Sequence, residues 1–300
     1  MAPKNAIVLA MFGTTEESAL PGLLKVHECF RQAYPLTQVR LAFTSNIIRN
    51  VWRKRAHDTE YRLKNTFIPE EIFTVQGQLA AIANLQDQGY RSIVVQAIQM
   101  APAEEFHDLA SYVKSLAGIR TMKPRWQPFE KLVIGRPILG TYSPTHPYGN
   151  DILELAKALE EDVKQAAKHG AALVYMGHGN PFFPSGGLYL ELESRMRTMY
   201  PQIPIHIGTV EGYPSLDEVL AGLATQGAQK VLLKPLLIVA GSHALKDMVS
   251  QQPASWQSRL ATAGHQVIPM IKGLGEQTPV ARLFVQHAAQ AAENAGIELQ

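Results

Sequence analysis

Short runs of Val, Ile and Leu alternate with longer amphipathic stretches along almost the whole chain, and this alternation limits the fold more than any other feature. Apolar strands separated by helical patterns are typical of a parallel sheet with helices on both faces. Strands are predicted near 5–11, 38–43, 91–97, 131–134, 171–176, 204–208, 229–235 and 265–269. Helices are predicted over 18–34, 45–56, 69–88, 104–117, 148–168, 187–199, 214–226 and 277–296.

A Pro- and Gly-rich stretch over 135–147 divides the predicted strands into two sets of four. The chain of 300 residues is long enough for two ordinary domains. We therefore predict an α/β protein of two similar Rossmann-like or flavodoxin-like domains, each with a four-stranded parallel sheet flanked by helices. The domains are placed at 1–141 and 142–300, and the terminal helix, 277–296, is a candidate to pack back on the N-terminal domain.

The two halves of the sequence also resemble each other. Three pairs of segments match in the same order: Leu85–Gly89 with Leu223–Gly227, Phe12–Thr14 with Met176–His178, and Thr44–Ser45 with Val210–Glu211. Carrying the spacing of the first pair forward places Glu105 opposite His243. Matches in a constant order indicate an internal duplication.

Three polar residues follow consecutive strands of the second half. His178 follows strand 171–176, Glu211 follows 204–208, and His243 follows 229–235 and its apolar extension. Ligands of open α/β sheets bind at the carboxyl ends of the strands. Two imidazoles and one carboxylate suit Co²⁺, Fe²⁺, Ni²⁺ or Zn²⁺, and three protein ligands leave coordination positions open. Any single His at a strand end is more often a hydrogen-bonded scaffold residue than a ligand, but His, Glu and His at three successive strand ends favour a metal site.

Composition excludes several other classes of protein. The net charge of +2 is too small to indicate nucleic-acid binding, and a single cysteine, Cys29, excludes a disulfide framework and a multi-cysteine metal cluster. Neither a Walker A loop nor a dinucleotide-binding glycine fingerprint is present, so neither ATP nor NAD is expected. The N-terminus lacks the pattern of a signal peptide, and no apolar run is long enough for a membrane span. We expect a cytoplasmic protein with no membrane or nucleic-acid partner.

The sequence resembles the anaerobic cobaltochelatase family CbiK from its first strand to near the C-terminus. The segments that carry the resemblance are Phe12–Thr14, Ala42–Ser45, Met176–Gly179, Val210–Pro214, Val239–Met248 and Gly273–Glu276. The resemblance implies the chelatase fold, two similar α/β domains around a tetrapyrrole cleft. It also implies that His178, Glu211 and His243 hold the metal and that Glu105 faces the cleft from the other domain. Related proteins often carry a His where this chain has Gln99, so no ligand role is carried over to that position.

The expected activity is that of a lyase, a sirohydrochlorin cobaltochelatase that inserts Co²⁺ as substrate metal, without ATP, in anaerobic cobalamin biosynthesis. Fe²⁺, Ni²⁺ or Zn²⁺ can substitute in such a ligand set. His178 is expected to act as a proton acceptor as well as a ligand, and Glu105 to exchange a proton or orient the ring. Because sirohydrochlorin is rich in carboxylates, Arg49, on a predicted helix with Arg53, is a candidate to bind one of them.

Two other functions fit the same residues. A sirohydrochlorin ferrochelatase, which serves sirohaem synthesis, would use the same ligands, because they do not separate Co²⁺ from Fe²⁺. A non-catalytic protein that holds a metal or a tetrapyrrole is the third reading. A homo-oligomer is compatible with each of them.

Overall fold

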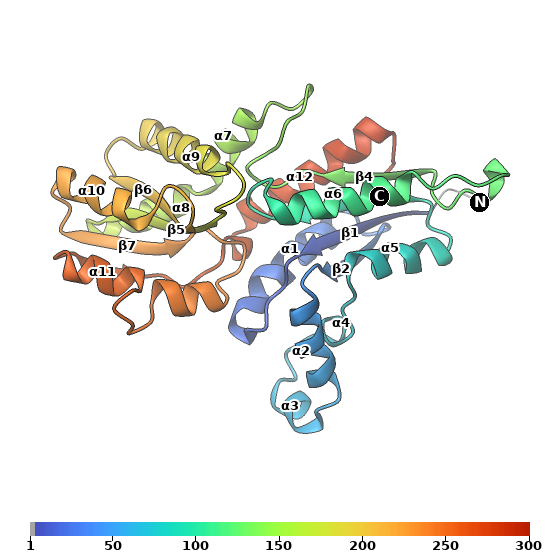
Figure 1. Ribbon diagram of the computed structural model, residues 1–300, viewed down its shortest axis with the longest axis horizontal. Helices are drawn as coiled ribbons and strands as arrows, with labels where there is room; N and C mark the ends of the chain where they lie inside the picture. The colour runs from blue at the N-terminus through green and yellow to red at the C-terminus, as the bar shows by residue number, and fades with distance from the viewer. Residues whose placement is uncertain (1–3) are drawn as a thin grey trace.

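The computed structural model describes residues 4–300, so Met1–Pro3, where the expectation about an N-terminal targeting segment begins, lie outside it. The chain forms two α/β halves that lie side by side (Figure 1). The first sheet contains β1 (Asn5–Met11), β2 (Gln38–Phe43), β3 (Ser92–Ile98) and β4 (Lys131–Gly135). The second contains β5 (Ala172–Gly179), β6 (Ile205–Glu211), β7 (Lys230–Pro235) and β8 (Gln266–Pro269).

Both sheets have the same topology. Their strand orders are β2-β1-β3-β4 and β6-β5-β7-β8, and every strand pair is parallel. All eight predicted strands are therefore present, and the prediction of two four-stranded parallel sheets is confirmed. The shared order supports the internal duplication that the three sequence matches indicated.

The central strands form because both of their faces are buried. On β1, Ile7 and Leu9 belong to one core cluster, while Ala6, Val8 and Ala10 belong to another on the opposite face of the sheet. All five side chains are fully buried. A strand covered on both faces needs a continuous apolar run instead of an alternating pattern, which is why this signal was visible in the sequence.

Helices cover both sheets. In the first half they are α1 (Leu20–Ala33), α2 (Asn46–Ala56), α3 (Thr59–Lys64), α4 (Glu70–Phe73), α5 (Gln78–Asp87) and α6 (Glu104–Ala117). In the second half they are α7 (Tyr148–Ala158), α8 (Glu160–His169), α9 (Gly186–Met199), α10 (Leu216–Gln226), α11 (Trp256–Thr262) and α12 (Thr278–Ala295). Short helical turns add η1 (Glu17–Ala19), η2 (Pro124–Trp126), η4 (Leu274–Glu276) and the π-helical η3 (Ala244–Met248). None of the helices in residues 4–300 combines the length and apolarity needed to span a bilayer.

Two predicted helices are each divided in the structure. The predicted helix 69–88 becomes α4 and α5, because Gln76 between them pairs with Ala42 of β2 and so leaves the helical conformation. The predicted helix 148–168 becomes α7 and α8, which meet at the buried Leu159. The break lets α7 pack on α9 and α12 while α8 packs on β5 and β7. Helices α3 and α11 were not predicted.

The last helix, α12, crosses back and lies against α1, β3 and β4 of the first half (Figure 1). A buried ion pair ties it to α7 and to the segment after β4. The Nε atom of Arg136 lies 2.6 Å from Oδ2 of Asp151, and Nε2 of His287 lies 3.2 Å from Oδ1 of the same carboxylate. Burial alone would raise the pKa of Asp151, but hydrogen bonds from Arg136 and His287 lower it. The domain boundary at 141/142 stays a prediction.

Candidate active site

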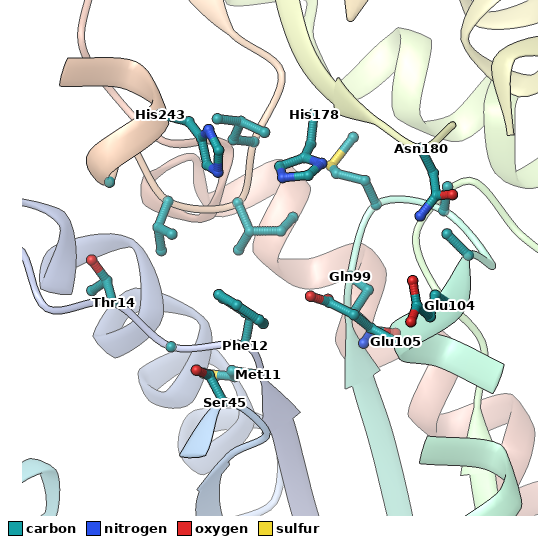
Figure 2. Close-up of a pocket in the computed structure, with 18 of the residues that line it drawn as sticks. Met11, Phe12, Thr14, Ser45, Gln99, Glu104, Glu105, His178, Asn180 and His243 are labelled. Atoms are coloured by element: carbon teal, nitrogen blue, oxygen red, sulfur yellow. The ribbon is translucent and has the colours of Figure 1, made fainter. Parts of the chain in front are cut away.

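A cavity of about 590 Å³ lies between the carboxyl ends of the two sheets, which is the place where parallel sheets bind ligands. The first half contributes Phe12, Thr14, Ser45, Gln99 and Glu105 to its walls, and the second half contributes His178, Asn180, Glu211 and His243. Figure 2 shows that the two halves face each other across this space, with the histidines on one wall and Phe12, Gln99 and Glu105 on the other. The pocket therefore unites residues that are far apart in sequence.

His178 stands at the end of β5, in a turn that only small residues allow. A Cβ atom on Gly179 would lie 1.8 Å from the carbonyl oxygen of Glu211, and the φ angle of this glycine is +75°. Its carbonyl oxygen lies 3.0 Å from Nδ1 of His178. With Nδ1–H donated to that carbonyl, the Nε2 atom keeps its lone pair for a metal ion.

His243 comes from the loop after β7 and begins the π-helical turn η3. Its Nδ1 atom lies 2.6 Å from Oδ2 of Asp247, one turn later. A carboxylate that accepts the Nδ1 proton fixes the tautomer and the orientation of the ring, and so leaves the lone pair of Nε2 for a ligand. Asp247 is a residue of the site that sequence reasoning missed, although its spacing of four from His243 was a usable signal.

The two imidazoles are neighbours. Their ring centroids are 4.6 Å apart and their planes meet at 83°. Both rings lie on the same wall of the pocket (Figure 2). Because each Nδ1 is engaged by a protein oxygen, the two Nε2 atoms are the ring nitrogens left for a ligand.

Glu211 lies on the same wall as the two histidines, but the three side chains are not arranged as a set of metal ligands. It ends β6 beside Gly179, is exposed, and lines the pocket. Throughout residues 4–300, no group of three or more His, Cys, Asp and Glu side chains is arranged to hold a metal ion. The structure thus brings His178 and His243 together, and the role of Glu211 as third ligand stays a prediction.

Glu105 faces the histidines from the first half, in the first turn of α6. The residue is exposed to solvent, but partial loss of hydration at the cleft raises the pKa of its carboxyl group, and the charge of His178 acts in the opposite direction. The two groups are therefore electrostatically coupled across the cavity. A carboxyl group whose pKa is moved toward neutrality is suited to exchange protons with a bound ligand.

The charges of the pocket are acidic, which differs from the expectation for a carboxylate-rich ligand. The charged residues among its described lining are Glu104, Glu105 and Glu211, together with the two histidines, and neither Lys nor Arg is among them. Such a lining favours a divalent cation. The carboxylates of a tetrapyrrole must therefore find neutral donors here or lie toward the rim.

Arg49 is occupied elsewhere. Its Nη1 atom donates to the carbonyl oxygens of Phe43 and Thr44, at the end of β2, the second at 2.8 Å. A Cβ atom on Gly77 would lie 2.9 Å from its guanidinium carbon, so the group is enclosed by backbone. Arg49 does not line the pocket as described. Its binding to a substrate carboxylate stays a prediction, and its visible role is to hold the start of α2.

Comparison with known proteins identifies a family. A family model described as cobalt chelatase (CbiK) matches residues 5–293. The sirohydrochlorin cobaltochelatase CbiKC of Nitratidesulfovibrio vulgaris is 30% identical over 288 residues, which cover 96% of this chain and 90% of that protein. The sirohydrochlorin cobaltochelatase of Salmonella typhimurium is 27% identical over 289 residues, 96% of either chain.

A solved structure supports the fold. The structure of SirB from Bacillus subtilis with Fe³⁺ has a TM-score of 0.62 to this chain at 14% identity, and the match covers 99% of this chain and 100% of the other. At that identity the likeness concerns the arrangement of helices and strands alone. It agrees with two α/β halves around one cleft.

Proposed function

Because the chain belongs to the cobalt chelatase (CbiK) family, we propose that it inserts Co²⁺ into sirohydrochlorin by means of His178 and His243. The observation that carries this proposal is the pair of adjacent imidazoles, both with Nδ1 engaged and Nε2 available, on one wall of a cavity between two sheets. The cavity of about 590 Å³ is in the size range of small-molecule sites.

The two Nε2 atoms would hold the ion before transfer. Neutral imidazoles replace part of its hydration shell and leave positions that ring nitrogens can take. Glu211 is proposed as the third ligand, which requires its exposed side chain to turn into the pocket. Its negative charge would offset that of the ion, as the acidic lining of the pocket already does.

Insertion forms metal–nitrogen bonds and releases two pyrrole protons, which need acceptors. We propose that one proton goes to Nε2 of His178, which becomes available once the ion has moved to the ring. The other goes to the Glu105 carboxylate on the opposite wall. The raised pKa of Glu105 fits this role, because the group can hold a proton at a pH where an ordinary carboxyl group would not.

An anaerobic absorbance assay tests the proposal directly. Sirohydrochlorin is mixed with Co²⁺, Fe²⁺ or Ni²⁺, with and without protein, and the spectrum of the metallated ring is followed. We expect the largest acceleration with Co²⁺. A larger acceleration with Fe²⁺ would favour the ferrochelatase alternative. Binding of the ring without acceleration by any metal would identify a non-catalytic binding protein.

Several narrower parts of the proposal need their own measurements. Turnover in nucleotide-free buffer tests whether insertion is independent of ATP. The same assay tests whether Fe²⁺, Ni²⁺ or Zn²⁺ can replace Co²⁺.

Sedimentation tests whether the protein is a homo-oligomer. Fractionation of the producing cell tests whether it is cytoplasmic. For Arg49, an unchanged KM for sirohydrochlorin in Arg49→Ala would argue against contact with a substrate carboxylate.

A further inference from the structure

Gln99 is a buried amide that has no partner. It directly follows β3, lines the pocket, and is only 7% exposed. Neither its Oε1 nor its Nε2 atom has a hydrogen-bond partner within residues 4–300. Buried amides in native proteins nearly always have partners, because an unsatisfied group loses the hydrogen bonds that water would give it. Such a group at a ligand pocket indicates a partner that arrives with the ligand.

A second glutamine, on β3 itself, provides a contrast for the amide nitrogen. Gln96 is not among the residues that line the pocket and is fully buried, and its Nε2 atom donates to the carbonyl oxygens of Ala97 and Arg136 at 2.8 and 2.9 Å, so that within residues 4–300 only its Oε1 atom is left without a partner. The fold therefore supplies backbone acceptors to one buried amide of β3. The structure supplies none to the amide that lies at the pocket.

The surroundings of Gln99 select the chemistry of its partner. Apolar Met11, Phe12, Ile98 and Met100 line the pocket with it, as does the acidic Glu105. A substrate carboxylate on this floor would lose its hydration and meet a like charge, with no cation to compensate it. A neutral N–H donor has neither disadvantage.

The position of Gln99 points to one such donor. Figure 2 shows it on the wall opposite His178 and His243. A flat macrocycle between the walls would turn one face to the two imidazoles and the other to Phe12 and Gln99. Pyrrole N–H groups at the centre of the ring are the neutral donors that reach this second face.

We propose that the amide oxygen of Gln99 accepts a hydrogen bond from a pyrrole N–H of the metal-free ring, an inference that rests on the proposed function. The bond draws the hydrogen out of the ring plane on the Gln99 side, which turns the nitrogen lone pair toward the metal on the histidine side. The metallated product has lost its pyrrole hydrogens. Gln99 therefore favours substrate over product and assists product release.

The test compares two ligands in one variant. Affinities of metal-free sirohydrochlorin and of cobalt-sirohydrochlorin are measured anaerobically, by fluorescence quenching and by competition, for wild type and Gln99→Leu. Loss of one hydrogen bond should weaken binding of the metal-free ring about tenfold. Binding of the cobalt complex should stay within about twofold, because no pyrrole hydrogen is present. Stability should not fall, since Gln99→Leu removes two unpartnered polar atoms.

Two controls separate this role from a structural one. Gln96→Leu removes a buried amide of β3 away from the pocket, and should leave the ratio of the two affinities unchanged. Gln99→Met, which keeps an unbranched side chain, should reproduce the effect of Gln99→Leu, because both variants lack the amide. An effect seen with leucine alone would come from disturbed packing and would overturn the proposal. Equal weakening of both ligands, or no change in either, would overturn the proposal. These titrations contain no free metal ion, so their outcome is independent of whether the wild-type protein inserts cobalt.

Discussion

The two halves of the molecule share a strand order but use the equivalent strand ends differently. The sequence matches pair Thr14 with His178, Ser45 with Glu211 and Glu105 with His243, and all six residues line the same pocket. In the first half, the Thr14 hydroxyl accepts a hydrogen bond from the backbone N–H of Glu16, and Ser45 caps α2. Their polar atoms are occupied in holding their own loops.

In the second half, the residues at the equivalent positions have polar atoms that are not used in holding their own loops. His178 and His243 each use Nδ1 to fix the ring and leave Nε2 for a ligand. Glu105 is the one member of the first set whose charged group is directed to the cleft, where its pKa is raised. Under the proposed function, the second half would hold the metal and accept one pyrrole proton at His178, and the first half would accept the other at Glu105.

Removal of either imidazole should have the largest effect on activity. In His178→Ala and His243→Ala, insertion of Co²⁺ should fall to the uncatalysed rate, while circular dichroism and thermal melting stay close to wild type. The matched control is His169→Ala, at the exposed end of α8, which should keep full activity. Wild-type turnover in either pocket variant would contradict the assignment of the metal site to the second half.

Replacement of Glu105 should reduce the rate without removing the metal site. Glu105→Gln should lower kcat by about a hundredfold, the usual contribution of a proton acceptor, and leave Co²⁺ binding intact. Since the carboxylate form accepts the proton, wild-type activity should rise with pH through the raised pKa of Glu105. The variant should lose this dependence, and a pH–rate profile of kcat/KM checks it. If Glu105→Gln kept the wild-type pH–rate profile, Glu105 would not be the group that accepts the proton.

The carboxylate behind His243 should have a smaller but measurable effect. Without the Asp247 acceptor, the ring can rotate or change tautomer, so Asp247→Ala should weaken Co²⁺ binding by about ten- to a hundredfold. Isothermal titration with Co²⁺ measures this, and the exposed Asp87→Ala serves as control. Equal affinities of Asp247→Ala and Asp87→Ala for Co²⁺ would mean that the hydrogen bond from His243 to Asp247 does not contribute to metal binding.

The smallest effect is expected at Glu211, because its side chain is exposed. Glu211→Gln should raise the KM for Co²⁺ by tenfold or less, about the contribution of one weak polar interaction. Initial rates at fixed sirohydrochlorin and varied Co²⁺ give this value. A loss as large as that of His178→Ala would show that Glu211 is a full ligand during turnover.

The main features of the fold were predictable because they depend on short-range patterns. Apolar runs such as Ile93–Val95 and Val231–Leu233 are strands buried on both faces, and their pattern does not depend on a partner. The division of helix 69–88 was not predictable in this way. It depends on the pairing of Gln76 with Ala42, a tertiary contact that no local pattern contains.

The site was predictable where strand ends determine position. His178, Glu211, His243 and Glu105 all reach the pocket, because the carboxyl ends of parallel strands share an edge of the sheet. Arg49 shows the limit of this reasoning. Its helical pattern made it a candidate to bind a substrate carboxylate, which stays a prediction, but no local pattern indicated that carbonyl groups at the end of β2 accept hydrogen bonds from its side chain.

The return of α12 to the first half matters while the chain is being synthesised. The sheet from β1 to β4 is complete by residue 135, but the helix that covers one of its faces begins only at Thr278. At ordinary rates of translation, α12 is synthesised about ten to thirty seconds after the strands that it covers. During this interval the ribosome-bound chain displays Val94 and Ile98 of β3 on a partly open sheet, and a circular permutant that begins with α12 should be less prone to aggregate on refolding.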